Sequence, residues 1–337
     1  MFKIIALLRS LLYLLLPLSL LLTACGDDAA LTSTAPASAP DRVRKQVPVP
    51  AFSADSAYQY IADQVAFGPR VMNTDAHEAA RAYLAAKLRS FGAEVEEQKF
   101  TATAYDGTAL ESTNLIARFN PDDPDRLLLA AHWDTRHVAD SRLEDDPTAV
   151  VQGADDGASG VGVLLEIARQ LGRSTPDIGV DIVLFDAEDY GGPGDTESWG
   201  LGSQHYAKSL TGTKARYGIL LDMVGAKDAT FAYEGYSKQN AQPVLDKVWG
   251  IAAQLPYAKP YFPKRDGSAV TDDHFFVMKY AGIPMIDIIN HRQDTDSGFV
   301  RHWHTGNDNL DVIDKATLRA VGQTVTALVY REGQGRI

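Results

Sequence analysis

Acidic and imidazole side chains gather in five short stretches that lie far apart in the sequence. Most of these stretches follow a run typical of a buried strand, such as residues 127–131 and 180–185. In an open α/β sheet, side chains beyond the carboxyl ends of strands converge on one crevice. Because crowded carboxylates repel one another unless a cation compensates them, we interpret the stretches as one metal site. They are His132-Trp133-Asp134, Asp155-Asp156, Glu188-Asp189, Asp222 and Trp303-His304.

His132 and Asp134 stand two residues apart at the end of the first run. On an extended chain such residues leave the same face, so both side chains can reach one site. A carboxylate commonly binds the second ring nitrogen of a metal-bound histidine. We predict that His132 contacts the metal and that Asp134 orients its imidazole. A purely structural histidine-aspartate pair is the alternative.

Asp155 and Asp156 lie among glycine, alanine and serine residues at the start of a predicted helix. The alternative interpretation is a helix N-cap, in which an aspartate satisfies free backbone amides. A cap accounts for one aspartate but not for two adjacent ones among small residues, where a close-approaching ion is the simpler explanation. We therefore predict Asp156 as a metal ligand.

Three acids in four residues, Asp186, Glu188 and Asp189, directly follow a buried strand. They would repel strongly unless a cation or shared protons relieve them, although a solvated turn is the alternative. In an extended segment Glu188 and Asp189 point to opposite sides. One of them can then bind the metal while the other acts as a general base.

Asp222 and His304 are single residues whose surroundings do not explain them. Asp222 is an acid at the end of the apolar strand predicted at 217–221, and it is interpreted as a ligand or proton partner, with a turn cap as the alternative. His304 lies in a predicted loop that has no amphipathic pattern, which favours a ligand role.

Asp272-Asp273-His274 begins a predicted helix, so one of the two aspartates can serve as its N-cap. The other, together with His274, is available to orient Glu188 or a substrate. The sequence does not divide these two roles between Asp272 and Asp273.

Tryptophans flank several of the acidic stretches and suggest an aromatic pocket wall. Trp133, Trp199 and Trp303 have this placement, and plain core packing is the alternative for Trp133 and Trp199. Trp249 lies in a helical apolar pattern and is expected in the core. The remaining histidines, His77, His137, His205, His291 and His302, are expected to have structural or surface roles.

Strand and helix patterns alternate along most of the chain. This order predicts an α/β fold with a mixed, mostly parallel central sheet flanked by helices. The expected strands are residues 93–102, 112–119, 127–131, 180–185, 217–221 and 283–289. The expected helices are residues 54–65, 75–89, 157–171, 203–210, 242–254, 273–281 and 312–330.

The first residues resemble an export signal. Lys3 and Arg9 precede a leucine-rich run at 11–22, which is followed by small residues and Cys25. We predict a lipoprotein signal peptide at 1–24, a lipidated Cys25 with a flexible linker at 25–50, and a single zinc-dependent catalytic domain at 51–337. An incidental thiol is the alternative for Cys25. The expected location is the periplasmic side of a bacterial envelope, at the outer membrane.

Composition excludes two classes of site. The chain has 44 acidic and 32 basic residues and a net charge of −12, and it has no basic stripe, so we expect no nucleic-acid partner. Cys25 is the only cysteine, which excludes an internal disulfide and cysteine-ligated metal. We expect a monomer.

From residue 51 to residue 330, these motifs in this order resemble the M28 zinc aminopeptidase-like family, which includes the animal-type glutaminyl-peptide cyclotransferases. The resemblance implies a mixed sheet between helix layers. It places Glu188 at the general-base position. The five metal-ligand positions of the family correspond to His132, Asp156, Asp189, Asp222 and His304.

The resemblance sharpens toward the cyclotransferases around Asp222, at 272–275 and at 303–305. It implies one zinc held by Asp156, Asp189 and His304. It also implies a proton-linked network of Asp222 and Asp272 with Glu188, and a narrow pocket shaped by Trp303 and Trp199. The chain departs from the animal enzymes in its lack of their cysteines, in Asp189 where they carry glutamate, and in an insert at 191–200.

Three functional hypotheses follow. The first is a glutaminyl-peptide cyclotransferase, which acts on peptide or protein N-termini and releases ammonia. The second is a two-zinc aminopeptidase of the same family, in which His132 and Asp222 hold a second ion. The third is a catalytically silent binding module on this scaffold, and a complete ligand set with Glu188 argues against it.

Overall fold

The computed structural model describes residues 43–146, 148–292, 294–295 and 298–337. The predicted signal peptide, Cys25 and most of the predicted linker lie outside these residues. One compact unit spans Arg44–Ile337. Residues 44–50, which we expected in the linker, belong to it: Val47 is buried, and its carbonyl accepts a hydrogen bond from Gln334 Nε2 at 2.6 Å. The folded unit therefore begins ahead of residue 51.

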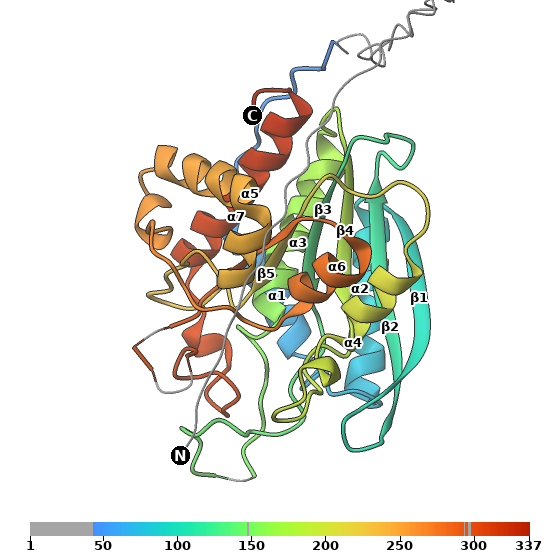
Figure 1. The fold of residues 1–337 in the computed structure, drawn as a ribbon, viewed down its shortest axis with the longest axis vertical. Helices are drawn as coiled ribbons and strands as arrows, with labels where there is room; N and C mark the ends of the chain where they lie inside the picture. The colour runs from blue at the N-terminus through green and yellow to red at the C-terminus, as the bar shows by residue number, and fades with distance from the viewer. Residues whose placement is uncertain (1–42, 147, 293, 296–297) are drawn as a thin grey trace, which may run out of the picture. The chain divides into compact units, whose positions relative to one another are not determined.

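A six-stranded sheet forms the centre of this unit (Figure 1). Its strand order is β1-β2-β4-β3-β5-β6, and β4, β3, β5 and β6 are parallel, whereas β1 and β2 are antiparallel additions at one edge. The predicted fold class is confirmed. The strands are β1 Glu94–Thr103, β2 Ala109–Phe119, β3 Arg126–His132, β4 Gly179–Phe185, β5 Gly218–Asp222 and β6 Met285–Ile289.

Helices cover both faces of the sheet, as the continuous apolar runs of β3 and β4 require. Alternate residues of β3 enter different cores: Leu127 and Leu129 pack in the larger core, and Leu128 packs in the smaller one. The larger core includes residues of α1 Ala54–Val65, α2 Asp75–Ser90, α3 Ala158–Arg173, α5 Gly235–Gln254 and α7 Lys315–Gly333. The smaller core includes residues of α4 Leu201–Ser209 and α6 Asp273–Ala281.

The two largest differences between predicted and observed helix starts have local reasons. Helix α5 begins at Gly235 rather than at residue 242, and the backbone breaks at Ala241 (φ −139°), two residues before Pro243. The prediction captured only the part after this break, because proline interrupts a helical pattern. Helix α7 begins at Lys315 with Asp314 as its N-cap, and the residues where we expected its start form a short 3-10 turn, Leu310–Val312.

Among the described residues, no helix has the length and the apolar character that crossing a membrane requires.

Candidate metal centre and active site

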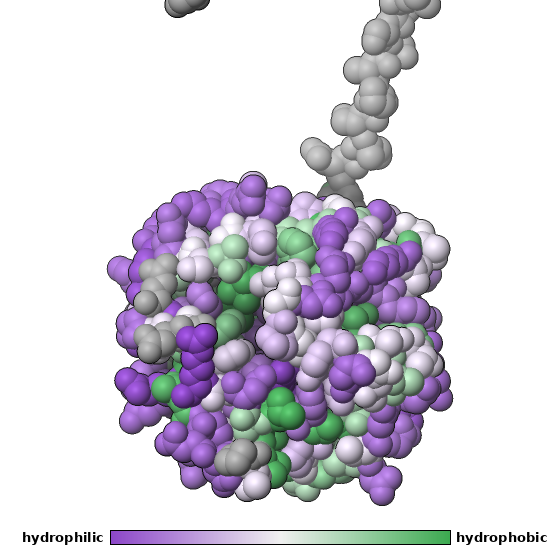
Figure 2. All heavy atoms as spheres, turned by 60° about the horizontal axis from the view of Figure 1, so that its bottom comes forward, coloured by the Kyte–Doolittle hydropathy of each residue, from purple (hydrophilic) through white to green (hydrophobic). Residues whose placement is uncertain are grey.

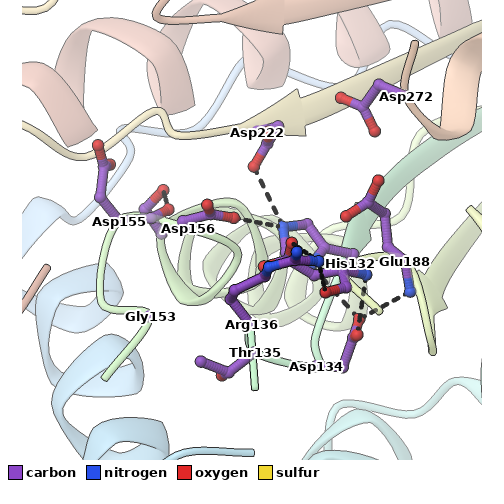
Figure 3. Close-up of polar contacts among 12 residues, drawn as sticks. His132, Asp134, Thr135, Arg136, Gly153, Asp155, Asp156, Glu188, Asp222 and Asp272 are labelled. Carbon is purple, nitrogen blue, oxygen red and sulfur yellow. Dashed lines mark hydrogen bonds and ion pairs between the residues drawn. The ribbon is translucent and has the colours of Figure 1, made fainter. Parts of the chain in front are cut away.

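Three neighbouring parallel strands end at the same edge of the sheet, and the side chains of the candidate site lie at or just beyond these ends. His132 is the last residue of β3 and Asp222 is the last residue of β5. His132 pairs in register with Phe185, the last residue of β4, and the chain then continues to Glu188. Figure 3 shows Asp222 and Asp156 pointing toward His132. The predicted convergence of distant acids therefore occurs.

Two glycines at the start of α3 allow it to approach the ends of β3 and β5 closely. A Cβ on Gly157 would lie 2.5 Å from His132 Nε2, and one on Gly160 would lie 2.1 Å from the carbonyl oxygen of Leu221. Gly157 itself is the N-cap of α3, and no side chain caps the helix. The capping alternative for Asp155 and Asp156 is therefore wrong.

Asp156, Asp189 and His304 form a first donor group, and all three are buried. His304 Nε2 lies 3.1 Å from Asp189 Oδ1 and 3.8 Å from Asp156 Oδ2. The other oxygen of Asp189, Oδ2, is buried without a hydrogen-bond partner among the described residues. A buried carboxylate oxygen of this kind requires a proton or a cation.

His132, Asp156 and Asp222 form a second donor group on the other side of Asp156. His132 Nε2 lies 3.0 Å from Asp156 Oδ1 and 3.2 Å from Asp222 Oδ1, as the dashed lines in Figure 3 show. Asp156 therefore offers one oxygen to each group. Asp156 is thus placed to bridge two ions if both groups are occupied.

The donor sets fit zinc. The ligand atoms of each group lie within 4.8 Å of one another, and carboxylate oxygen and imidazole nitrogen are both zinc ligands. Three protein ligands with an open fourth position are typical of catalytic zinc. Burial and the charge of Asp156 raise the pKa of Asp222 well above 3.8, and burial raises the pKa of Asp189 against the opposing charge of His304. A cation would replace the protons that these groups otherwise retain.

Glu188 lines the pocket, and its carboxyl group turns toward Asp272 in Figure 3. Burial raises its pKa well above 4.5. The positive charge of His132 opposes this rise, and the negative charges of Asp189 and Asp272 add to it. A carboxyl group with a raised pKa accepts and returns a proton more readily near neutral pH. This environment suits the predicted role of Glu188 as a general base.

Asp134 positions the segment that carries Glu188 and Asp189. Its two carboxylate oxygens accept hydrogen bonds from the backbone amides of those residues, each at 3.1 Å. Asp134 Oδ1 also lies 3.4 Å from His132 Nδ1, so the predicted pairing with His132 is looser than these two bonds. The sequence pattern indicated the pair but not the amide contacts.

A cavity of about 400 Å³ lies beside the first donor group. Figure 2 brings forward the face at the bottom of Figure 1, where hydrophobic groups lie among hydrophilic ones around a hollow. The wall includes Trp199 and Trp303, and the Trp303 ring stacks on His304 with 3.7 Å between centroids. Trp133 is instead a core residue: it is fully buried, its Nε1 donates to the Thr113 carbonyl at 3.2 Å, and its ring stacks on His77.

Asp272 and Asp273 have different roles. Asp272 caps α6 through a 2.5 Å bond from the Asp273 amide and also lines the pocket. Asp273 is fully buried, and its carboxyl group lies beside Ser203 of α4 rather than in the pocket wall. Asp272 is therefore the one of the two aspartates that faces the pocket.

Behind Asp272 lies a carboxyl group that we did not predict, Asp287. Asp272, His274 and Asp287 have ligand atoms within 4.8 Å of one another, and all three residues are buried. Burial and the charge of Asp272 raise the pKa of Asp287 well above 3.8. The signal in the sequence was an acid inside the apolar strand β6.

Other residues that we did not predict contact the candidate ligands or their backbone from behind. Asp308 accepts hydrogen bonds from the amides of Asp155 at 2.8 Å and Asp156 at 3.2 Å. Asp155 in turn pairs with His302 Nε2 at 2.8 Å, so Asp155 supports the ligand loop rather than binding the metal. Asp140 lies 2.8 Å from His304 Nδ1. No periodicity links these residues to the ligands in sequence.

Three non-glycine residues at the site have left-handed backbone conformations. They are Ala187 (φ 52°), Met223 (φ 47°) and His304 (φ 54°). Ala187 directly precedes Glu188, and Met223 directly follows Asp222. Such conformations cost on the order of 1–3 kcal/mol each and persist where the surrounding structure imposes them, often at active sites.

Glu234 ties together the segments that carry Asp272. Its carboxylate caps α5, accepts a hydrogen bond from the amide of Val270 at 2.9 Å, and lies 2.9 Å from His274 Nε2. Burial raises the pKa of Glu234, but the hydrogen bonds from His274 and Ser237 outweigh it and lower the pKa to about 2.

This pairing predicts acid-sensitive stability. A pKa lowered from 4.5 to about 2 stabilises the fold fully above pH 4.5, and the contribution is lost as pH falls from 4.5 toward 2. Its size is about 3 kcal/mol. In urea unfolding, we expect Glu234→Gln to be less stable than wild type at pH 7, with a smaller difference at pH 4. A difference that is constant with pH would contradict the ionised pairing.

Comparison with known proteins agrees with this geometry. The family model described as "Peptidase family M28" matches residues 114–329 of this chain. The glutaminyl-peptide cyclotransferase of Drosophila melanogaster is 27% identical over 281 residues, which cover 74% of this chain and 73% of that protein.

Two solved structures are also similar. The glutaminyl cyclase of Porphyromonas gingivalis is 52% identical with a TM-score of 0.81, and the match covers 83% of this chain and 99% of that one. A Zn-dependent exopeptidase from Parabacteroides distasonis is 51% identical with a TM-score of 0.81, covering 84% and 99%. The resemblance inferred from the motifs is confirmed. Because the family model spans more than half of the sequence, the chain belongs to peptidase family M28.

Proposed function

We propose that the chain is a zinc-dependent glutaminyl-peptide cyclotransferase that converts an N-terminal glutamine to pyroglutamate and releases ammonia. The observation that carries the proposal is the placement of Glu188, Asp222 and Asp272 around one pocket beside the first donor group, with Trp199 and Trp303 in its wall. The similarity to cyclotransferases from an insect and a bacterium supports it.

The first donor group, Asp156, Asp189 and His304, would hold the zinc. When bound, zinc supplies Lewis-acid polarisation of the substrate's side-chain amide carbonyl. The tryptophan walls limit the conformations of a flexible glutamine side chain, which favours a pose in which its own α-amine faces the amide carbon. Holding the reacting groups in this pose contributes much of the acceleration.

Glu188 moves the proton. The α-amine nitrogen forms a bond to the side-chain amide carbon, and Glu188 accepts the proton that the amine loses. The bond between that carbon and the amide nitrogen then breaks, and Glu188 returns the proton to the departing ammonia. Asp222 and Asp272 orient the amine and the Glu188 carboxyl group. No water is consumed.

A two-zinc aminopeptidase is the second candidate. The second donor group, His132, Asp156 and Asp222, provides ligands for another ion, and the exopeptidase from Parabacteroides distasonis is nearly as similar to the chain as the cyclase is. We propose one zinc, because Asp140 fixes the imidazole of His304 at 2.8 Å, whereas Asp134 lies 3.4 Å from His132. A firmly oriented histidine binds zinc better.

Two peptides distinguish the candidates. Purified protein is incubated with a glutamine-initiated peptide and with a leucine-initiated peptide of otherwise identical sequence. The masses of the products are then measured by mass spectrometry. We expect the first peptide to lose ammonia and the second to stay intact. Release of free leucine, with the glutamine peptide unchanged, would support the aminopeptidase instead.

We propose that the enzyme is a monomer that acts on peptide and protein N-termini. We also propose that a lipidated Cys25 anchors it on the periplasmic side of a bacterial envelope, at the outer membrane. The positive residues, the leucine-rich run and the small residues before Cys25 support export and lipidation. Metabolic labelling with a fatty-acid analogue tests the lipidation, and Cys25→Ser should abolish the label.

A further inference from the structure

Arg136 is a buried cation in the loop that follows β3, and its side chain is 2% exposed. Its Nη1 donates to the carbonyl oxygens of Asp189 at 2.8 Å and Gly191 at 2.9 Å. Its Nη2 and Nε donate to the two carboxylate oxygens of Asp140, at 2.6 Å and 3.3 Å. Four of the five guanidinium N–H groups are therefore committed within the protein, so Arg136 holds loops together rather than anchoring a substrate.

Asp140 extends this contact to a metal ligand. Its Oδ1 lies 2.8 Å from His304 Nδ1, and His304 Nε2 lies 3.1 Å from Asp189 Oδ1. With the Nδ1 hydrogen donated to Asp140, the lone pair of Nε2 faces the first donor group. The contacts thus form a closed ring, which runs from Asp189 to Arg136, Asp140 and His304 and back to Asp189. Two of its four members are candidate zinc ligands.

Arg136 also supports the pocket wall. Its guanidinium carbon lies 4.8 Å from the centre of the Trp199 ring, and that ring is nearly parallel to His304 at 6.4 Å. The Trp199 Nε1 donates to the carbonyl of Gly192 at 3.2 Å. A Cβ on Gly191 would lie 2.0 Å from the Trp199 ring, so the segment after Asp189 packs directly against it.

We propose that Arg136 and Asp140 are positioning residues that couple zinc affinity to the shape of the substrate pocket. The inference rests on the proposed function for its substrate. Asp140 sets the orientation of His304, and Arg136 joins that orientation to the backbone of Asp189 and to the face of Trp199. Loss of Asp140 should therefore weaken zinc binding, and loss of Arg136 should in addition loosen the pocket.

Zinc affinity tests the role of Asp140. Zinc-free wild type and variants are titrated with ZnCl₂ against a chromophoric chelator. We expect Asp140→Ala to bind zinc roughly 10–100-fold more weakly, as removal of such a partner commonly does. Asp140→Asn should bind zinc several-fold more weakly than wild type but more tightly than Asp140→Ala, because its amide oxygen still accepts the Nδ1 hydrogen while the negative charge is lost. This intermediate loss tests the proposal if the alanine variant does not fold.

Asp181→Ala is the matched control. Asp181, on β4, also accepts two hydrogen bonds from a buried arginine, at 2.5 Å and 3.0 Å. That arginine, Arg126, is the first residue of β3, at the end of the strand away from the site. We expect Asp181→Ala to lose stability and to keep the zinc affinity of wild type. Equal zinc affinity in wild type, Asp140→Ala and Asp181→Ala would overturn the proposal.

Steady-state kinetics with saturating zinc test the role of Arg136. We expect Arg136→Gln to raise KM for a glutamine-initiated peptide several-fold more than it lowers kcat, because Trp199 loses its support while Glu188 stays in place. A fall in kcat with KM unchanged would overturn the coupling to the pocket. Wild type that binds zinc but does not release ammonia would contradict the proposed function alone, since the affinity measurement needs no turnover.

Discussion

Glutamine in place of Glu188 is expected to lower kcat by roughly 10²–10⁴-fold, the usual contribution of a general base. The amide has nearly the same shape as the carboxylate but cannot accept the proton of the attacking amine. Burial raises the pKa of Glu188 well above 4.5, so the rate of wild type should fall as pH drops through this pKa, where the base becomes protonated. The residual rate of the variant should lack this dependence.

Glu96→Gln provides a matched control for this change. Glu96 lies on β1 and pairs with Arg118 on the surface, at 2.9 Å. It should keep the wild-type rate, and both variants should retain wild-type zinc content. Unchanged turnover in Glu188→Gln would remove Glu188 from the mechanism.

Removal of zinc with a chelator is expected to reduce turnover by roughly 10³-fold, because polarisation of a carbonyl by a metal contributes several kcal/mol. One equivalent of ZnCl₂ should restore the rate. His304→Ala removes one of the three ligands of the first donor group and should need far more zinc for the same recovery. Metal content measured by mass spectrometry, together with ammonia release, checks both results.

His205→Ala controls for the loss of a histidine. His205 stacks on Phe100 and belongs to neither zinc donor group, so this variant should recover like wild type. Full turnover in protein from which zinc has been removed would contradict the metal requirement. A need for two equivalents of zinc would favour the two-zinc alternative.

The sequence predicted the parts of the site that lie directly at strand ends. The apolar run of β3 ends at His132, and that of β5 ends at Asp222. Parallel strands place their carboxyl ends together, so candidate ligands far apart in sequence could be assigned to one site. The α/β class followed from the same alternation of strands and helices.

The partners behind the ligands could not be predicted in this way. Asp140 and His304 are 164 residues apart, and both lie in loops whose paths no periodicity determines. Nothing in the sequence singles out Arg136, because a sequence does not show that the carbonyl groups of Asp189 and Gly191 will lie beside it. Asp287 did carry a local signal, as an acid among apolar strand residues, and we did not use it.

Asp156 presents its two oxygens to different neighbours, one beside His132 and the other toward His304. With such a shared carboxylate, the site can hold one ion or two without a change in the shape of the cavity. His132, Asp156 and Asp222 already lie close enough together to hold a further cation. Because the same backbone can present one ligand set or two, metal stoichiometry is a more informative measurement than backbone shape for this chain.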